Sequence, residues 1–504
     1  MNPAIGRIGA ELSPRRPGAL GRRARGVLVA GRAAMDQAFG MAPRITIVGG
    51  GSTHWTPKLL IDFANTPALH AADVVLMDID GDALKPMLDV AAHIATRRDI
   101  PLTARATTDL DDATEGTDVV IAALTVGGFA SMGHDIEIPA RYGLRQPVGD
   151  SIGPGGIARA LRSVPVVVDI AETVARRSPD ALFVNVSNPL TALCRAVTRE
   201  TGLRTVGMCN ELVGLQFVMS LLFDADLLGV DPQVGGVNHF PLCTGLRISG
   251  QDGFAMLDEL LADPGRLAEP VWMAPPDGMH YRKISPGRDW TRADVVAGNR
   301  LKLELFRRFR VLPGASDTHS SEFLPPFVTP RSDFGREWGV YQYGLAQHQI
   351  DKRADDESVA EVLGNNEIPT WPSGELVAPL LAGYFATPDV AKPSAALPVN
   401  LPNTGQVTTL PAGVVVECMG VAAGREIRPR DRVTMPGYLG EQLRRIVASQ
   451  ELTVEAALTG SRRTALEAML ADPYAALLPY EDAVALTDEL LAATAPWLPR
   501  FAPR

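Results

Sequence analysis

The stretch that decides the fold class is Arg44-Ile45-Thr46-Ile47-Val48-Gly49-Gly50-Gly51-Ser52. Its first half is a short, mostly apolar run rich in β-branched residues, which is typical of a buried parallel strand. The glycines that follow allow the backbone to approach a pyrophosphate, and the N-terminus of a following helix presents free N–H groups to it. We therefore expect a dinucleotide to bind at Gly49, Gly50, Gly51 and Ser52, although glycines also suit any tight turn.

Further strands are expected at residues 74–77, 119–124, 182–186 and 205–208, with helical segments between them. This alternation predicts βαβ units and an α/β fold with a Rossmann-type, doubly wound sheet. Asp78 ends the second strand, where an acid accepts hydrogen bonds from the ribose hydroxyls of NAD. It lies 78 − 51 = 27 residues after Gly51, which is longer than the usual spacing of about 20. A plain turn with Asp78 as a helix cap is the alternative.

The chain of 504 residues is expected to hold two folded parts after an atypical beginning. Residues 1–40 are rich in arginine, glycine, alanine and proline, which predicts a disordered extension or a start codon chosen too early. Residues 41–213 are expected to form the NAD-binding domain, and residues 214–504 an α+β catalytic and substrate domain.

The composition excludes several classes of protein. With 46% hydrophobic and 21% charged residues, the chain is typical of soluble globular proteins. A net charge of −10 argues against a nucleic-acid surface, and the absence of an apolar run of 18 residues argues against a membrane span. Four cysteines are too few for a disulfide framework, so we expect a cytoplasmic protein.

Polar residues follow several of the expected strands, at the edge of the sheet where open α/β folds bind ligands. Asn188 follows residues 182–186, and Cys209-Asn210 follows residues 205–208. A thiolate and the imidazole of His239 can share one metal ion, but the spacing of these two residues equally suits a buried thiol and a structural histidine. Residues 316–322 are dense in titratable and hydroxyl groups, which suits either a site or a solvated loop.

Taken in order, these segments resemble glycoside hydrolase family 4 over about residues 44–500. The resemblance is carried by residues 45–52, Gly153-Pro154-Gly155-Gly156, Asn188-Pro189, Cys209 and Gly236-Val237-Asn238-His239. Members of this family are NAD- and Mn-dependent glycosidases with a fold akin to lactate and malate dehydrogenases. The resemblance therefore implies NAD and Mn²⁺, or another divalent metal, as cofactors.

The resemblance also implies an unusual mechanism that needs no pair of carboxylates. NAD oxidises C3 of the sugar, and the resulting ketone acidifies the proton on C2. A base removes this proton, the aglycone leaves by elimination, water adds to C1, and the hydride returns.

Carried over by position, the resemblance gives roles to individual residues. Cys209 and His239 would hold the metal, Asp150 would be the carboxylate of acid catalysis, and either Tyr281 or Asp317 would be the base. The residues expected to contact the sugar are Asn188, Asn210, Arg282 and His319.

The expected substrate is a small glycoside whose sugar is not settled by the sequence. Residues 317–322 resemble the branch acting on unphosphorylated sugars, and Arg282, Lys283 and Arg288 would suit a uronide or a sulfoquinovoside. Asn210 after the cysteine resembles the 6-phospho-glycosidases, which are the alternative. A 2-hydroxyacid dehydrogenase and an NAD-sensing protein without catalysis are further alternatives. A homodimer or homotetramer is expected from the resemblance.

Overall fold

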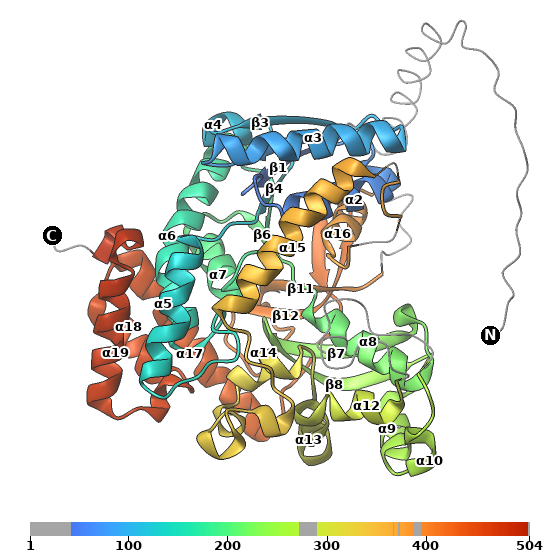
Figure 1. Cartoon of the computed structure of the whole chain (residues 1–504), viewed down its shortest axis with the longest axis vertical. Coiled ribbons are helices and arrows are strands. Elements are labelled where there is room, and N and C mark those ends of the chain that lie inside the picture. The colour runs from blue at the N-terminus through green and yellow to red at the C-terminus, as the bar shows by residue number, and fades with distance from the viewer. Residues whose placement is uncertain (1–41, 272–289, 366, 371–372, 387–394, 502–504) are drawn as a thin grey trace, which may run out of the picture.

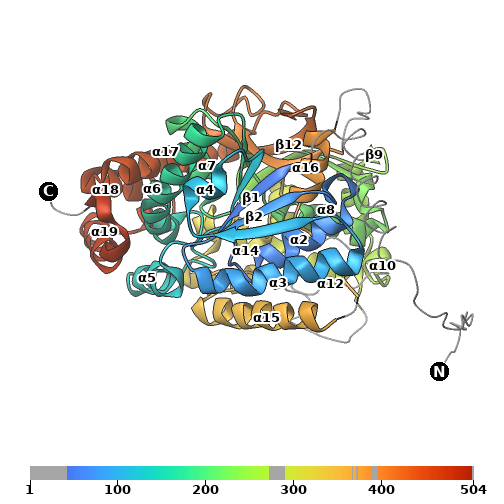
Figure 2. The ribbon, with the colours of Figure 1, turned by 90° about the horizontal axis from the view of Figure 1, so that it is seen from above.

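The computed structural model describes residues 42–271, 290–365, 367–370, 373–386 and 395–501. The expected disordered extension at residues 1–40 lies outside the described residues. In the described part, helices cover both faces of one large sheet (Figures 1 and 2). Every described helix is too short or too polar to span a lipid bilayer.

The first half of the sheet has the strand order 3-2-1-4-5-6 of a Rossmann fold. All of its neighbouring strands pair in parallel. The strands are β1 (Arg44–Val48), β2 (Asp73–Met77), β3 (Thr103–Thr107), β4 (Val119–Ala122), β5 (Leu182–Asn185) and β6 (Arg204–Gly207). Each strand expected from an apolar run is present, whereas β3 was not expected.

The two faces of this half form separate cores because successive side chains of a strand point to opposite faces. Ile45 and Ile47 of β1 pack in one core with Leu60 of α2 (Trp55–Asn65). Val48 packs in the other core with Val164 of α6 (Gly153–Arg177). Helices α3 (Gly81–Arg98) and α16 (Val377–Phe385) belong to the first core, and α7 (Leu190–Glu200) to the second.

The sheet continues without a break into the second half of the chain. β6 pairs antiparallel with β11 (Leu397–Pro402), and the order then runs through β12 (Val415–Ala423), β7 (Val230–Val237), β8 (Phe240–Ile248) and β10 (Leu312–Pro313). Two short strands, β9 (Gln251–Asp252) and β13 (Glu426–Pro429), pair with β8 and β12. The expected boundary at residue 213 falls inside α8 (Glu211–Phe223). The fold class is confirmed as a Rossmann-type sheet followed by an α+β part.

The later helices cover both parts of the sheet. Helix α15 (Leu345–Gly364) lies alongside α3 (Figure 2), so a segment of the second half contacts the first half. Helix α17 (Gly437–Thr459) packs on α6 and α7. The remaining helices are α4 (Leu110–Thr114), α5 (Gly128–Arg141), α9 (Gly253–Leu261), α10 (Pro264–Leu267), α12 (Arg292–Ala297), α13 (Arg300–Phe309), α14 (Asp317–Glu322), α18 (Arg462–Ala471) and α19 (Tyr480–Ala493).

Candidate active site

The glycine turn after β1 is built by close backbone contacts. The amides of Gly49 and Gly50 donate to the carbonyl of Met77 at 2.9 and 2.8 Å. Gly49 has a φ of +89°, and a Cβ on it would lie 2.0 Å from the carbonyl oxygen of Ala123. The turn ends at Ser52, whose hydroxyl accepts a hydrogen bond from the amide of Trp55 at the start of α2. This turn follows β1, whose neighbour in the sheet is β4. The strand order reverses between these two strands, and such folds bind dinucleotides at that point.

Asp78 lies beside this turn and is not the cap of α3. Its Oδ2 accepts a hydrogen bond from the amide of Gly51 at 3.0 Å, and its Oδ1 accepts one from Asp80. The cap of α3 is Asp80, whose side chain accepts from the amides of Asp82 and Ala83. The carboxylate of Asp78 is therefore held at the end of β2, next to the turn, where an NAD ribose would lie.

A second cluster brings together three residues that are far apart in the sequence. Asp150, His239 and His319 each offer a ligand atom within 4.8 Å of the others. Asp150 precedes α6, His239 occupies the turn between β7 and β8, and His319 lies on α14 (Figure 1). The two imidazole rings are 4.0 Å apart, and His239 has a φ of +65°, a conformation uncommon outside glycine. Such strain is often found at functional sites.

Two neighbours fix the carboxylate of Asp150. The hydroxyl of Ser151 donates to its Oδ1 at 2.7 Å, and the side-chain amide of Asn188 donates to its Oδ2 at 2.8 Å. The same hydroxyl lies 2.9 Å from Nδ1 of His239. The structure thus brings four of the predicted site residues together: Asp150, Asn188, His239 and His319.

Two groups of the cluster, Asp150 and His239, have the ionisation that suits a metal ligand. Burial alone would raise the pKa of Asp150, but the charges of His239, His319 and Arg159 outweigh it and hold this pKa well below its usual range. Burial and the charge of His319 lower the pKa of His239 to about 4. An ionised carboxylate and a neutral imidazole are donors for Mn²⁺ and related ions. Within the described residues, Nδ1 of His319 is buried without a hydrogen-bond partner, which fits a ligand atom.

Cys209 is not one of the three clustered residues, but it interacts with Asn238, the residue before His239. Burial raises the pKa of its thiol well above the usual value, and the charges of Glu417 and Glu211 raise it further. Asn210 donates a long hydrogen bond of 3.4 Å to Glu375. The role of Cys209 as a metal ligand stays a prediction, as does the role of Asn210 in binding the sugar.

Asp317 has contacts that differ from those expected of a base. Its two carboxylate oxygens accept hydrogen bonds from the amides of Leu301 and Lys302, at 2.9 and 3.1 Å, in the first turn of α13. Burial raises the pKa of Asp317 to about 6, against the charge of Lys302. Tyr281 and Arg282, the other predicted base and a predicted sugar contact, lie outside the described residues.

Three acids near the cluster, two of them buried, were not among the predicted site residues. The Oε1 of Glu211 lies 3.9 Å from Nε2 of His319. Glu322 is fully buried, and burial and the charge of Asp150 raise its pKa to about 7. Burial also raises the pKa of Glu417 to about 8. One signal marks Glu417 in the sequence: it is a single acid within the apolar run 414–421.

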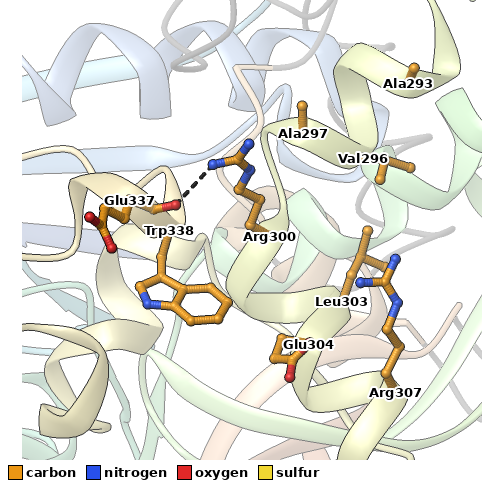
Figure 3. A pocket seen from close by; sticks show the side chains of 9 residues that line it. All are labelled: Ala293, Val296, Ala297, Arg300, Leu303, Glu304, Arg307, Glu337 and Trp338. Carbon is orange, nitrogen blue, oxygen red and sulfur yellow. Dashed lines mark hydrogen bonds between the residues drawn. The ribbon is translucent and has the colours of Figure 1, made fainter. Parts of the chain in front are cut away.

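One cavity in the described part of the structure lies away from these residues. It has a volume of about 480 Å³ and lies on α12 and α13, beside the ring of Trp338 (Figure 3). Arg300 closes one side by donating to the carbonyl of Glu337 at 2.9 Å. The cavity is lined by Ala293, Val296, Ala297, Arg300, Leu303, Glu304, Arg307, Glu337 and Trp338. Because it contains none of the clustered groups, we do not place the reaction there.

Comparison with known proteins identifies the family. The model of the family 4 glycosyl hydrolases matches residues 44–224, and the model of their C-terminal domain matches residues 234–475. The chain is 28% identical over 468 residues to an α-galacturonidase of Thermoanaerobacterium saccharolyticum, covering 90% of this chain and 96% of the relative. It is 27% identical over 466 residues to an α-galactosidase of Bacillus subtilis, covering 91% and 99%.

A solved structure has the same fold. The 6-phospho-β-glucosidase of Thermotoga maritima, solved with manganese, NAD⁺ and glucose-6-phosphate, superposes with a TM-score of 0.70 at 21% identity. The match covers 90% of this chain and 99% of that chain. The chain belongs to family 4 of the glycosyl hydrolases, because the two family models together match most of its length. This confirms the expected family and the class of enzyme, a hydrolase of glycosidic bonds.

Proposed function

We propose that the protein cleaves a small glycoside with the help of NAD, bound at the glycine turn, and of Mn²⁺ or a related ion, bound at the cluster. The observation that carries this proposal is the hydrogen bond of 2.8 Å between Asn188 and Asp150. It joins the carboxyl end of β5, in the NAD-binding half, to the cluster that His239 and His319 complete. The resemblance to family 4 supports pairing the two sites in one reaction.

The residues of the chain take separate parts in this proposal. When bound, NAD would accept and return a hydride at C3 of the sugar, and the metal would polarise the sugar oxygens. Asp150, His239 and His319 would hold the metal, with Cys209 as a further ligand that must lose its proton to bind. Asn188 would fix Asp150 and face the sugar.

The assignment of acid and base groups follows from the contacts. We propose Tyr281 as the base that removes the C2 proton, since both oxygens of Asp317 bind the first turn of α13. The resemblance assigns Asp150 to acid catalysis, but we propose it as a metal ligand, because a carboxylate that stays ionised beside His239 and His319 carries no proton for the departing oxygen.

The proposed sugar is unphosphorylated, either a charged sugar such as a uronide or sulfoquinovoside, or a neutral hexoside. The α-galacturonidase and α-galactosidase relatives support this choice. Arg159 adds support for a charged sugar, because its guanidinium places a positive charge near Asp150. A 6-phospho-glycosidase is the alternative, supported by the enzyme from Thermotoga maritima. We also propose a homodimer or homotetramer in the cytoplasm.

A panel of nitrophenyl glycosides tests this function. The purified protein is assayed with NAD⁺, Mn²⁺ and a reductant against hexosides, their 6-phosphates, glucuronides, galacturonides and sulfoquinovosides of both anomers. We expect cleavage that falls at least about 100-fold after removal of NAD⁺ or of the metal by a chelator, since each supplies a step of the chemistry.

The control is restoration of activity when NAD⁺ or Mn²⁺ is added back to the treated protein. Cleavage that persists undiminished without both cofactors would refute the proposed mechanism, and preference for 6-phosphates would favour the alternative substrate.

A further inference from the structure

We infer that Glu322 is a positioning residue, which sets the loop carrying Asp150 against the rest of the cluster. The inference rests on the proposed function for its catalytic meaning. Glu322 is the last residue of α14 and is fully buried. Its Oε1 accepts hydrogen bonds from two consecutive backbone amides, those of Val148 at 3.1 Å and Gly149 at 2.7 Å.

These two bonds fix the backbone immediately before Asp150. Gly149 has a φ of +76°, so the chain turns sharply between the fixed amides and the carboxylate. The same helix carries His319 three residues before Glu322, one helical turn away. One short helix therefore supplies a member of the cluster and also holds the loop that supplies another.

The cost of burying Glu322 indicates that it does more than fill space. Within the described residues, its Oε2 is buried without a hydrogen-bond partner. Burying an acid with one unpaired oxygen costs free energy that an apolar side chain would not. A residue that lowers stability in this way is expected where its side chain is needed for function.

Asp317, on the same helix, makes a similar pair of hydrogen bonds, but with α13 rather than with the loop that carries Asp150. It is also buried and also accepts hydrogen bonds from two consecutive amides, but these belong to Leu301 and Lys302 of α13. Replacing Asp317 also removes two amide contacts made by a buried acid of α14, but it leaves the anchor of the Asp150 loop in place. It is therefore the matched control.

A double-mutant cycle tests the inference. Glu322→Ala and Asp317→Ala are each made in the wild-type chain and in Asp150→Asn, and kcat/KM is measured with the best substrate. In the wild-type chain, Glu322→Ala should lower kcat/KM by about 10- to 100-fold, since a misplacement of about 1 Å costs this much. In Asp150→Asn its effect should shrink below about 3-fold, because the group through which it acts is gone.

The control and the conservative variant sharpen the result. Asp317→Ala should have the same proportional effect in both backgrounds. Glu322→Gln keeps an oxygen acceptor for the two amides and should restore most of the activity lost in Glu322→Ala. If Glu322→Ala does not fold, Glu322→Asp, which is one methylene shorter, takes its place in the cycle. An equal effect of the Glu322 substitution in both backgrounds would overturn the inference.

The affinity for Mn²⁺, measured by calorimetry, separates this inference from the proposed function. Glu322→Ala should weaken Mn²⁺ binding by about 10-fold, since it displaces Asp150, one of the proposed donors, whereas Asp317→Ala should leave it within about 2-fold. This holds even for a protein that cleaves no glycoside, in which case the proposed function fails and the positioning role stands. Unchanged Mn²⁺ affinity in Glu322→Ala would refute the positioning role.

Discussion

Replacing Asp150 with asparagine should lower kcat/KM by about 100- to 10,000-fold, the range expected when a group that moves a proton or holds the metal is lost. Asparagine has nearly the same shape, so its oxygen can accept from Asn188 and its amide can donate to Ser151. The fold should therefore survive, and the loss should come from the missing charge beside His239 and His319. The measurement is kcat/KM at saturating NAD⁺ and Mn²⁺, with thermal unfolding as a check on the fold.

Ser151→Ala is the graded control for this variant. It removes one hydrogen bond to Asp150 and one contact with His239 but keeps both charged groups. We expect a loss of about 10-fold, well short of that in Asp150→Asn, because one hydrogen bond is worth about 1 kcal/mol. An Asp150→Asn protein that keeps more than half of the wild-type activity would show that the reaction takes place elsewhere.

Replacing Gly49 with alanine should have the largest effect on NAD binding. The new Cβ would lie 2.0 Å from the carbonyl oxygen of Ala123. Neither atom can rotate away, because one is a backbone atom and the other is attached directly to the backbone, so the turn must move. The left-handed conformation adds a cost of about 1 kcal/mol or more. We expect the dissociation constant for NAD⁺ to rise at least about 10-fold, measured by calorimetry, together with a lower free energy of unfolding.

Gly413→Ala separates the two causes. Gly413 has nearly the same φ, +83°, but a Cβ on it would have nothing within 4 Å. It should therefore lose only about 1 kcal/mol of stability and bind NAD⁺ as the wild type does. Equal effects of the two substitutions on NAD⁺ affinity would mean that the turn after β1 does not approach the cofactor.

The first half of the fold was predictable because its signals are local. Residues 45–48 form a strand because a short β-branched run followed by glycines is typical of a buried strand, and β2, β4, β5 and β6 also coincide with short apolar runs. β3 was missed because its sequence, Thr-Ala-Arg-Ala-Thr, contains no apolar run. It is an edge strand paired only with β2, so burial does not impose an apolar pattern on it.

Two segments rich in glycine or polar residues are helical, although their composition favours a loop. Gly153-Pro154-Gly155-Gly156 forms the first turn of α6, where a Cβ on Gly156 would lie 2.5 Å from the backbone of Ser151. The glycines there permit close packing rather than a turn. Residues 317–322 form α14, which Ser316 caps through the amide of His319. In both segments the helix is determined by tertiary packing, which cannot be read from local composition.

The cluster could be predicted only in part. The resemblance named four residues of the cluster: Asp150, Asn188, His239 and His319. Their spacing in the sequence does not predict that they lie close together in the fold. Their meeting depends on the β7–β8 turn and α14 being brought to the end of β5, through a sheet that β11 joins nearly 200 residues after β6. The anchoring of Asp150 by Glu322 depends on the same long-range packing and could not be read from the sequence.

The measurement that tests the central claim most directly is hydrolysis in D₂O followed by NMR of the released sugar. Removal of the C2 proton and its later replacement from solvent should leave deuterium at C2 of nearly every product molecule. Hydrolysis through a pair of carboxylates never breaks the C2–H bond. Deuterium at C2, dependent on added NAD⁺, is the predicted result, and a product with only hydrogen at C2 would contradict the account.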